Sequence, residues 1–318
     1  MGNILTSVNM YYVCDGSVRY LLFGARDIVN CLEVYYSCYT KTRVSMIPIS
    51  ETFRSQYKLL SPLGQGGYGS VWLSERRVDQ TKFAVKIIPD INCSRKTWCC
   101  VRNMYIPEEV MVWEDLSHPN ISSFVNVFYE HGKSTQAKWM LVMEYSPEFV
   151  DLFDYIDRHG TMSSEDAAHI IKKVIEVCYY LATENVDHRD IKDENILYNP
   201  KTKEIKLIDF GSASILSDCP YKTLQGTGVY IPPEFYRSGS YHAFPAAVWS
   251  IGCLSYVLLD GFCPFNTQQE VLEYKTLSST NLNIDSVSRD FITACLTIDP
   301  NCRISFQNLI YHNWFNRQ

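Results

Sequence analysis

A glycine-rich segment between two strand-like segments constrains this chain most. Residues 63–71 read LGQGGYGSV, which has the spacing G-x-G-x-x-G-x-V, and β-branched and aromatic residues continue the strand pattern through residue 75. Glycine lets a backbone turn tightly and approach phosphate oxygens closely. A dinucleotide-binding loop opens a helix instead, and a Walker loop ends in Gly-Lys-Ser/Thr. The segment predicts a hairpin that covers a nucleotide, although taken alone it fits a structural turn equally well.

The predicted elements form a strand-rich part followed by a helix-rich part. Strands are predicted over residues 57–63, 70–75, 82–88 and 138–144. Helices are predicted over residues 108–116, 151–159, 164–184, 246–259, 268–275 and 286–296, and Ser163 or Ser164 would cap the third of them. This order predicts an α+β fold with two lobes.

Composition limits the classes of function. The 318 residues are 46% hydrophobic with a formal net charge of -6, which excludes a largely disordered chain and argues against a nucleic-acid-binding surface. The 12 cysteines are the one unusual count. Because the sequence shows no secretory signal and no pair of C-x-x-C spacings, we expect buried or surface thiols rather than disulfides or a zinc site.

The first 50 residues differ from the rest. They are rich in Tyr and Cys without clear periodicity, so we expect residues 1–50 to be a poorly ordered N-terminal extension. The first six residues fit the M-G-x-x-x-[ST] pattern for myristoylation of Gly2, a short pattern that also occurs by chance. One acyl chain binds a membrane only marginally, and a palmitoylated Cys14 would add a second anchor. We therefore expect membrane association only if Gly2 is modified.

Further motifs follow the glycine-rich segment in a fixed order. Residues 83–86 (FAVK) place Lys86 in a hydrophobic strand, where a lone Lys usually points to water, and Glu109 on the next helix is its candidate partner. Residues 188–195 read HRDIKDEN and residues 208–211 read IDFG, followed by Gly226-Thr227, residues 232–234 (PPE) and Arg303. These are the signatures of protein kinases in the order that kinases show them.

The resemblance to protein kinases implies a task for each motif residue in phosphoryl transfer, where catalysis is mostly positioning and charge stabilisation. Lys86 would hold the α- and β-phosphates of ATP, and Glu109 would fix the geometry of Lys86. Asp190 would accept the proton of the attacking hydroxyl. Lys192 would steady the γ-phosphate, and Thr227 would brace Asp190 and Lys192.

Two motif residues are expected to bind metal and two to stabilise the fold. Asn195 and Asp209 would ligate Mg²⁺, a cation that prefers oxygen ligands. Glu234 and Arg303 would form a buried structural ion pair in the helical lobe.

Within the protein kinases, the sequence resembles the PIM serine/threonine kinases from about Phe53 to Phe315. Segments 151–154, 188–197, 206–212, 229–234 and 246–250 carry the resemblance, and most kinases have Asp where Ala247 stands. The resemblance implies a kinase domain over residues 53–315, with an N-terminal lobe (53–144) of mainly antiparallel sheet plus one helix, a hinge (144–147) and a mainly helical C-terminal lobe (148–315). It implies nucleotide binding by Leu63, Gly64, Gly66, Gly69, Val71, Ala84, Lys86, Met143 as the gatekeeper, Glu144 and Ser146 in the hinge, Leu197 and Ile208.

The hinge departs from the PIM pattern. PIM kinases have Pro at the third hinge position, which cannot donate a hydrogen bond, whereas this chain has Ser146 followed by Pro147. The free N–H of Ser146 could restore a second hydrogen bond to adenine, so we expect an ATP or inhibitor profile unlike that of the PIM family.

Two acidic residues match the PIM positions that recognise a basic residue three positions before the target Ser/Thr. Asp151 and Glu194 would hold an Arg guanidinium between them, although exposed acids are also common on a solvated surface. Val257 and Phe262 replace the acids that PIM kinases use for more distant basic residues, which puts the extended basic consensus in doubt.

The PIM-like activation segment, residues 209–234, is short and implies activity without phosphorylation there. A pseudokinase that binds ATP as a scaffold is the main alternative, but such proteins usually lack the Lys or one of the Asp residues that this chain retains. A small-molecule kinase is a third possibility, against which the intact peptide-docking segment 226–234 argues. We expect a monomeric, ATP- and Mg²⁺-dependent serine/threonine kinase of the cytoplasm and also the nucleus, with protein substrates that carry basic residues near Ser/Thr.

Overall fold

The computed structural model describes residues 9–14, 17–22, 52–66, 69–93, 95–99, 104–131, 137–273 and 284–316. The chain divides into two compact units, Met1–Ile47 and Pro48–Gln318. In the first unit, β1 (Asn9–Cys14) and β2 (Ser17–Leu22) pair as an antiparallel hairpin, where the sequence predicted no element. The myristoylation pattern at Gly2 lies outside the described residues.

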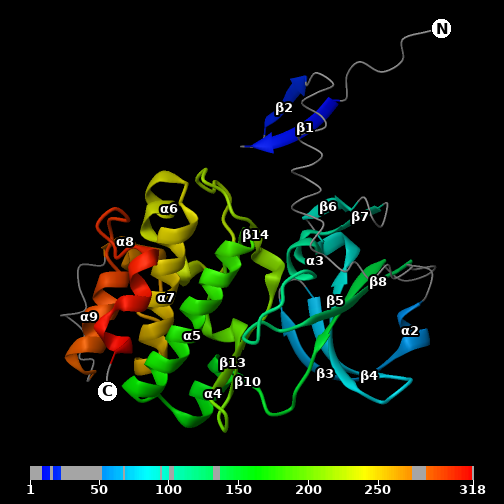
Figure 1. The fold of residues 1–318 in the computed structure, drawn as a ribbon, viewed down its shortest axis with the longest axis horizontal. Coiled ribbons are helices and arrows are strands. Elements are labelled where there is room, and N and C mark those ends of the chain that lie inside the picture. The colour runs from blue at the N-terminus through cyan, green and yellow to red at the C-terminus, as the bar shows by residue number, and fades with distance from the viewer. Residues whose placement is uncertain are drawn as a thin grey trace. The chain divides into compact units, whose positions relative to one another are not determined.

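The second unit begins with a five-stranded antiparallel sheet, drawn in blue, cyan and green in Figure 1. Its strands are β3 (Tyr57–Gly66), β4 (Gly69–Arg76), β5 (Lys82–Pro89), β8 (Phe124–Glu130) and β9 (Lys138–Glu144), in the order β3-β4-β5-β9-β8. The four predicted strands are all present, and β8 is an addition. Short elements flank the sheet: α2 (Phe53–Gln56), η1 (Asp90–Asn92), β6 (Lys96–Cys99), β7 (Met104–Pro107) and α3 (Glu108–Trp113).

Both faces of this sheet are covered. Alternate residues of β9 point to opposite faces, so Met140 packs with Phe53 and Tyr57, while Trp139 packs with Val110 of α3. Helix α3 therefore lies against one face of the sheet, which fixes the position of its first turn relative to β5.

Helix α3 is shorter than the sequence predicts. It ends at Trp113 rather than residue 116, because the Leu116 N–H bonds to the Trp113 carbonyl and tightens the chain into a turn. The Trp113 side chain is fully buried, and its indole N–H donates to the Ser122 carbonyl at 2.7 Å. This tryptophan anchors the end of α3 between the sheet and the helical part.

The rest of the unit is mainly helical and lies beside the sheet (Figure 1). Its helices are α4 (Leu152–His159), α5 (Ser164–Thr183), α6 (Pro233–Ser238), α7 (Ala243–Asp260), α8 (Gln268–Glu273) and α9 (Ser286–Cys295). Short strands and turns carry the motifs: β10 (Val150–Asp151), β11 (Val186–Asp187), η2 (Asp193–Asn195), β12 (Ile196–Asn199), β13 (Glu204–Leu207), η3 (Phe210–Ser212), β14 (Ser214–Ile215) and η4 (Gly228–Tyr230). Two more 3-10 turns, η6 (Phe306–Tyr311) and η7 (Asn313–Phe315), follow α9. The predicted α+β, two-lobed architecture is confirmed.

Helix boundaries follow local chemistry. Ser163 caps α5 by accepting a hydrogen bond from the Asp166 N–H at 3.1 Å, which decides between the two predicted caps. Helix α7 begins three residues earlier than predicted because Pro245 lies in its first turn, where no intrahelical donor is needed. By length and composition α7 is apolar enough to cross a membrane, but most of its side chains are buried in the helical core, as in the central helix of a soluble domain.

The predicted ion pair in the helical lobe is present. Arg303 donates to Glu234 through both terminal nitrogens, at 2.9 and 2.8 Å, and its side chain is 1% exposed. Its guanidinium also lies 5.1 Å from the ring centre of the buried Trp249. The pair joins the start of α6 to the segment that follows α9.

Candidate active site

Three motif residues from distant parts of the sequence meet between the two lobes. Lys86 on β5 donates to Glu109 Oε1 of α3 at 2.7 Å and to Asp209 Oδ1, just before η3, at 2.7 Å. Burial lowers the pKa of Lys86, but the two facing carboxylates outweigh burial, and the pKa is raised overall. Burial raises the pKa of the Glu109 carboxyl. At Asp209, the positive charge of Lys86 outweighs burial, and the pKa of that carboxyl is lowered. Lys86 is thus held as a cation at the junction of the lobes.

The backbone at Asp209 turns its carboxylate toward Lys86 and the next side chain into the core. Asp209 has a left-handed conformation (φ 61°), and its Oδ1 accepts from the Gly211 N–H at 3.1 Å. Phe210 is fully buried and stacks on Trp113 of α3, with ring centres 5.4 Å apart. It also meets the ring of His188 edge-on at 5.0 Å. The Phe210 ring thus couples α3 to the loop that carries Asp209.

A second cluster surrounds Asp190. Its Oδ1 accepts from the backbone N–H and the hydroxyl of Thr227, each at 3.1 Å, and its Oδ2 accepts from Asn195 Nδ2 at 3.0 Å. Lys192 Nζ lies 3.5 Å from Asp190 Oδ2 and donates to the Thr227 hydroxyl at 2.6 Å. Burial lowers the pKa of Lys192, but Glu194 and Asp190 outweigh it and raise the pKa overall. The Asp190 carboxylate is thus held by the N–H and hydroxyl of Thr227 and by the Asn195 amide, with the Lys192 ammonium beside it.

The activation segment approaches Asp190 closely, and only glycine fits at the point of contact. Gly226 has φ +92°, and a Cβ there would lie 2.6 Å from the Arg189 carbonyl oxygen and 3.2 Å from Asp190 Oδ1. This contact delivers the Thr227 N–H to Asp190.

The residues predicted to bind Mg²⁺ have suitable oxygens. Lys86 and the Gly211 N–H both use Asp209 Oδ1, so Oδ2 is the oxygen that remains for a cation. Asn195 donates to Asp190 through its amide nitrogen, so its amide oxygen is the atom that would bind a cation. Mg²⁺ typically takes one or two protein oxygens together with phosphate oxygens and water, so this pair fits a magnesium–nucleotide complex.

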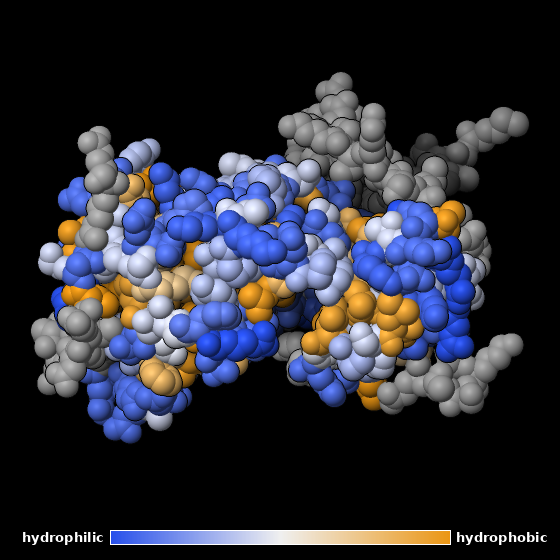
Figure 2. Space-filling model, turned by 90° about the horizontal axis from the view of Figure 1, so that it is seen from below, coloured by the Kyte–Doolittle hydropathy of each residue, from blue (hydrophilic) through white to orange (hydrophobic). Residues whose placement is uncertain are grey.

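The glycine-rich hairpin and the strands beside it form one wall of the site. The register places Gly64, Val71 and Lys86 side by side on β3, β4 and β5, and pairs Ala84 with Met143 on β5 and β9. Figure 2 shows the surface hollowed where the sheet part meets the helical part, with apolar side chains along the edge of the sheet part. A nucleotide base placed there would contact an apolar wall.

The glycines of the hairpin differ in how much space the protein leaves for a side chain. A Cβ at Gly69 would lie 2.1 Å from the Ile87 carbonyl oxygen, so packing against β5 already requires glycine there. A Cβ at Gly64 would meet nothing within 4 Å, so the protein itself leaves that position open. Gly66 pairs with Gly69 at the hairpin end, and Leu63 is 45% exposed at its base. Gly64 is therefore the glycine that a bound phosphate would explain.

The hinge and the opposite wall follow β9. Glu144 accepts from the Ser123 N–H at 3.0 Å and pairs with Lys206 at 2.7 Å, so its side chain points away from a nucleotide and fixes the hinge to β13. Within the part of the chain that the structure describes, the Ser146 N–H has no hydrogen-bond partner. Leu197 on β12 lies opposite Asp151, and the Ile208 N–H donates to the Asn195 carbonyl at 2.9 Å.

Both acidic residues predicted to bind substrate already have partners. Asp151 caps α4 by accepting from the Asp154 N–H at 2.7 Å, and burial raises the pKa of Asp151. Glu194 pairs with Lys192 at 2.6 Å while its side chain remains 54% exposed. A substrate guanidinium would therefore compete with Lys192 for Glu194 and would find Asp151 engaged with the helix end.

Sequence reasoning missed Arg95, which binds the beginning of the activation segment. Its Nη2 donates to the Ala213 carbonyl at 2.6 Å, its Nη1 donates to the Gly211 carbonyl at 3.4 Å, and its Nε donates to Glu108 of α3 at 2.8 Å. No motif marked this residue. Arg95 thus ties α3 to the stretch that follows Asp209.

Comparison with known proteins gives a consistent result. The sequence profile of the protein kinase domain matches residues 57–315. Serine/threonine-protein kinase pim-2 of Danio rerio is 34% identical over 272 residues, which cover 83% of this chain and 86% of that protein. Serine/threonine-protein kinase prk-2 of Caenorhabditis elegans is 32% identical over 268 residues, covering 84% of this chain and 59% of the relative. Myosin light chain kinase A of Dictyostelium discoideum is 32% identical over 269 residues, covering 81% and 87% respectively.

Proposed function

This chain belongs to the protein kinase family and is a protein serine/threonine kinase, and from that premise we propose that it is a PIM-like enzyme that transfers the γ-phosphate of ATP to Ser or Thr of protein substrates. One observation carries the catalytic part of the proposal. The Asp190 carboxylate is fixed by Thr227 and Asn195, beside Lys192, in the geometry of a poised proton acceptor.

In the proposed mechanism each residue acts from the position the fold gives it. The substrate hydroxyl approaches Asp190, which accepts its proton as the oxygen attacks the γ-phosphorus; the bond from this phosphorus to the bridging β-phosphate oxygen breaks, and ADP leaves. Lys192 and Lys86 supply positive charge near the transferred and remaining phosphates, and Glu109 holds Lys86 in place. Asp209 and Asn195 would hold Mg²⁺, which when bound neutralises charge on the phosphates.

The decisive experiment compares transfer of radiolabelled phosphate to Arg-rich Ser/Thr peptides by the wild type and by Asp190→Asn. We expect kcat to fall by about 10²–10⁴-fold, the usual range for loss of a general base. Asp157→Asn, an exposed residue on α4, is the matched control and should transfer at the wild-type rate. A wild type that binds ATP but transfers nothing would favour the pseudokinase scaffold, and full activity of Asp190→Asn would overturn the mechanism.

The hinge supports a distinct mode of adenine binding. We infer that the unpaired Ser146 N–H donates to the adenine base, a contact that proline at this position would remove. Ser146→Pro should raise KM for ATP by about 2–10-fold, which corresponds to one ordinary hydrogen bond. An unchanged KM for ATP in Ser146→Pro would contradict this part of the proposal.

We infer a preference for Arg three residues before the target, based on Asp151 and Glu194. Asp151→Asn tests it cleanly, because Asn removes the charge and remains a good helix cap. Both Asp151→Asn and Glu194→Gln should lower kcat/KM for peptides with Arg at that position and leave peptides with Ala there unaffected. A peptide array with no preference for Arg at that position would contradict the inference.

A further inference from the structure

Arg95 and the first residue of α3 bind each other twice. The Arg95 side chain donates from Nε to the Glu108 carboxylate at 2.8 Å, and the Glu108 backbone N–H donates to the Arg95 carbonyl at 3.1 Å. Lys96, the first residue of β6, pairs with Asp90 at 2.7 Å, and Asp90 also accepts from the Trp139 indole of β9 at 2.8 Å. The segment that carries Arg95 is therefore fixed to both α3 and the sheet.

The rest of the Arg95 guanidinium reaches the stretch that follows Asp209. Its Nη2 donates to the Ala213 carbonyl at 2.6 Å, and its Nη1 donates to the Gly211 carbonyl at 3.4 Å. Both acceptors are backbone atoms, so these bonds fix the path of the chain rather than one side chain. A planar guanidinium can serve three acceptors at once in this way, whereas a lysine ammonium carries all its donors on one atom.

These contacts close a ring of interactions around the Lys86 ammonium. Glu109, the second residue of α3, accepts from Lys86 Nζ at 2.7 Å. Lys86 also donates to Asp209 Oδ1 at 2.7 Å, and the same oxygen accepts from the Gly211 N–H at 3.1 Å. Arg95 binds the Gly211 carbonyl and the start of α3. It thus joins the two carboxylates that share Lys86 by a path that does not pass through Lys86.

This second path matters because Lys86 alone fixes the two carboxylates poorly. A lysine ammonium is a point charge on a flexible stem, so it can pair with Glu109 and Asp209 in many arrangements. Arg95 instead restricts where the backbone that follows Asp209 lies relative to α3. The path of this backbone decides where Asp209 Oδ2 points, which is the oxygen that remains for Mg²⁺.

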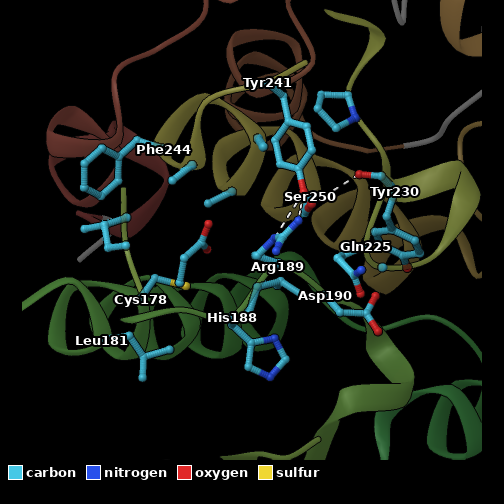
Figure 3. Close-up of a pocket in the computed structure, with 18 of the residues that line it drawn as sticks. Cys178, Leu181, His188, Arg189, Asp190, Gln225, Tyr230, Tyr241, Phe244 and Ser250 are labelled. Carbon is cyan, nitrogen blue, oxygen red and sulfur yellow. Dashed lines mark hydrogen bonds between the residues drawn. The ribbon is translucent and has the colours of Figure 1, made fainter. Parts of the chain in front are cut away.

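A second guanidinium binds the far end of the same segment but stays within the helical part. Arg189 lies in the wall of a cavity between α5 and the start of α7 (Figure 3). It donates to the Tyr241 hydroxyl at 2.9 Å and to the Thr223 carbonyl at 3.0 Å, and both partners belong to the helical part. Arg95 differs because it belongs to the sheet part and binds carbonyls of the helical part. Its bonds cross the junction between the lobes.

We propose that Arg95 is a positioning residue for the Mg²⁺ ligand Asp209, and that it acts by locking α3 to the backbone of residues 211–213. The inference rests on the proposed function, which assigns Mg²⁺ to Asp209 and Asn195. The side chains of Arg95 and Glu108 are 25% and 31% exposed, so their ion pair contributes little to stability. Loss of Arg95 should therefore disturb metal binding far more than it disturbs the fold.

The test uses the full chain and two substitutions of Arg95. Arg95→Met keeps most of the side-chain length but removes every donor, and it should lower kcat for a Ser/Thr peptide by about 10–100-fold, the effect of losing hydrogen bonds from a charged group. It should also raise the Mg²⁺ concentration for half-maximal rate by about 3–10-fold, with Arg95→Lys between Arg95→Met and the wild type. Arg77→Met is the matched control, because the exposed Arg77 likewise donates to a backbone carbonyl, that of Arg54 at 2.9 Å, and its loss should change neither value.

Two further readouts need no phosphate transfer. Mg²⁺ should tighten the binding of a fluorescent, non-hydrolysable ATP analogue to the wild type, and this gain should be about 3–10-fold smaller in Arg95→Met. Hydrogen exchange of residues 209–215 in the nucleotide-free protein should become about 10-fold faster in Arg95→Met, while the melting temperature falls by less than about 4 °C.

A double variant tests whether Arg95 acts through α3. Because Glu108 is expected to act only through Arg95, the losses in Arg95→Met/Glu108→Ala should equal those in Arg95→Met instead of multiplying with those of Glu108→Ala. Losses that multiply would overturn the proposed route.

The outcomes separate this inference from the proposed function. A wild type that binds the ATP analogue but transfers no phosphate refutes the proposed function, and analogue binding and hydrogen exchange then still test the role of Arg95. Wild-type Mg²⁺ dependence together with wild-type exchange in Arg95→Met overturns the inference. If Arg95→Met fails to fold, Arg95→Lys decides by the same measurements, and wild-type values in that variant would equally overturn it.

Discussion

Replacing Glu234 by Ala would leave a charged guanidinium inside the helical lobe without its carboxylate. In the wild type, Arg303 is 1% exposed and binds Glu234 through two hydrogen bonds, at 2.9 and 2.8 Å. Three carbonyls also accept from Arg303: those of Pro245 at 2.7 Å, Thr297 at 2.9 Å and Ile298 at 3.4 Å. Those bonds remain in the variant, but none of them carries a negative charge.

The expected cost follows from this environment. Breaking a buried ion pair by removing one partner costs about 3–5 kcal/mol, and the surviving carbonyl bonds place Glu234→Ala near about 3 kcal/mol. For a domain of this size about 1 kcal/mol corresponds to about 2–4 °C, so the melting temperature should fall by about 6–12 °C. The exposed Arg158–Asp154 pair on α4 is the matched control, and Arg158→Ala should cost only about 0.3–0.5 kcal/mol.

Urea unfolding followed by tryptophan fluorescence, with thermal melts beside it, measures both variants. The double variant Glu234→Leu/Arg303→Met should recover part of the loss, because an apolar pair replaces the isolated charge. If Glu234→Ala lost no more stability than Arg158→Ala, the claim that this pair stabilises the lobe would be wrong.

Other predictions concern the hairpin, the core beneath the site and the dependence on pH. Gly69→Ala should lower the free energy of unfolding by about 1–3 kcal/mol, because its Cβ would lie 2.1 Å from the Ile87 carbonyl oxygen. Gly64→Ala should keep the wild-type stability and raise KM for ATP, because its Cβ would meet no protein atom within 4 Å. Urea unfolding measures the first effect and ATP titration of the activity measures the second. Phe210→Ala should cost about 3–5 kcal/mol in the same unfolding assay, and a loss below about 1 kcal/mol would contradict its role in the core. The folded pKa of Asp187, about 6, exceeds its unfolded value of 3.8, so this group stabilises the fold below about pH 4 and that contribution is lost as pH rises through about 6. Relative to the wild type, Asp187→Asn should therefore gain about 2 kcal/mol between pH 4.5 and 7.5, and parallel pH curves would refute this.

The sequence predicted the central site well because each central residue lies within a motif of short, fixed spacing. Asp190, Lys192 and Asn195 fall within one loop, so the loop conformation alone brings them together. Lys86 and Asp209 come from separate motifs, yet each motif has a known place in a two-lobed kinase, and the structure joins them at 2.7 Å.

The sequence did not reveal residues that act through long-range contacts to backbone atoms. Arg95 is separated by 116 and 118 residues from the backbone carbonyls of Gly211 and Ala213 that it binds, and a residue of any type could supply those carbonyls. Spacing rules do not record such contacts.

The early end of α3 and the β1–β2 hairpin were missed for a different reason. Helical periodicity continues through residue 116, but the Leu116 N–H bonds three residues back, a choice set by Trp113 packing beneath the sheet. In the hairpin, NMYYVC on β1 does not alternate between apolar and polar residues, so no strand pattern was visible.

The two arginines outside the predicted set act on opposite ends of one segment in the same chemical way. Arg95 binds the carbonyls of Gly211 and Ala213 at its start, and Arg189 binds the carbonyl of Thr223 near its end. A planar guanidinium with five donors can serve several acceptors at once, and backbone carbonyls are present whatever the modification state of the side chains. A segment held by such bonds does not depend on a phosphate to supply the acceptor. These bonds support the expectation, drawn from the PIM-like activation segment, that the enzyme is active without phosphorylation in residues 209–234. They also predict that Arg95→Lys and Arg189→Lys, which keep the charge but lose the fork of donors, both lower kcat in the unphosphorylated enzyme.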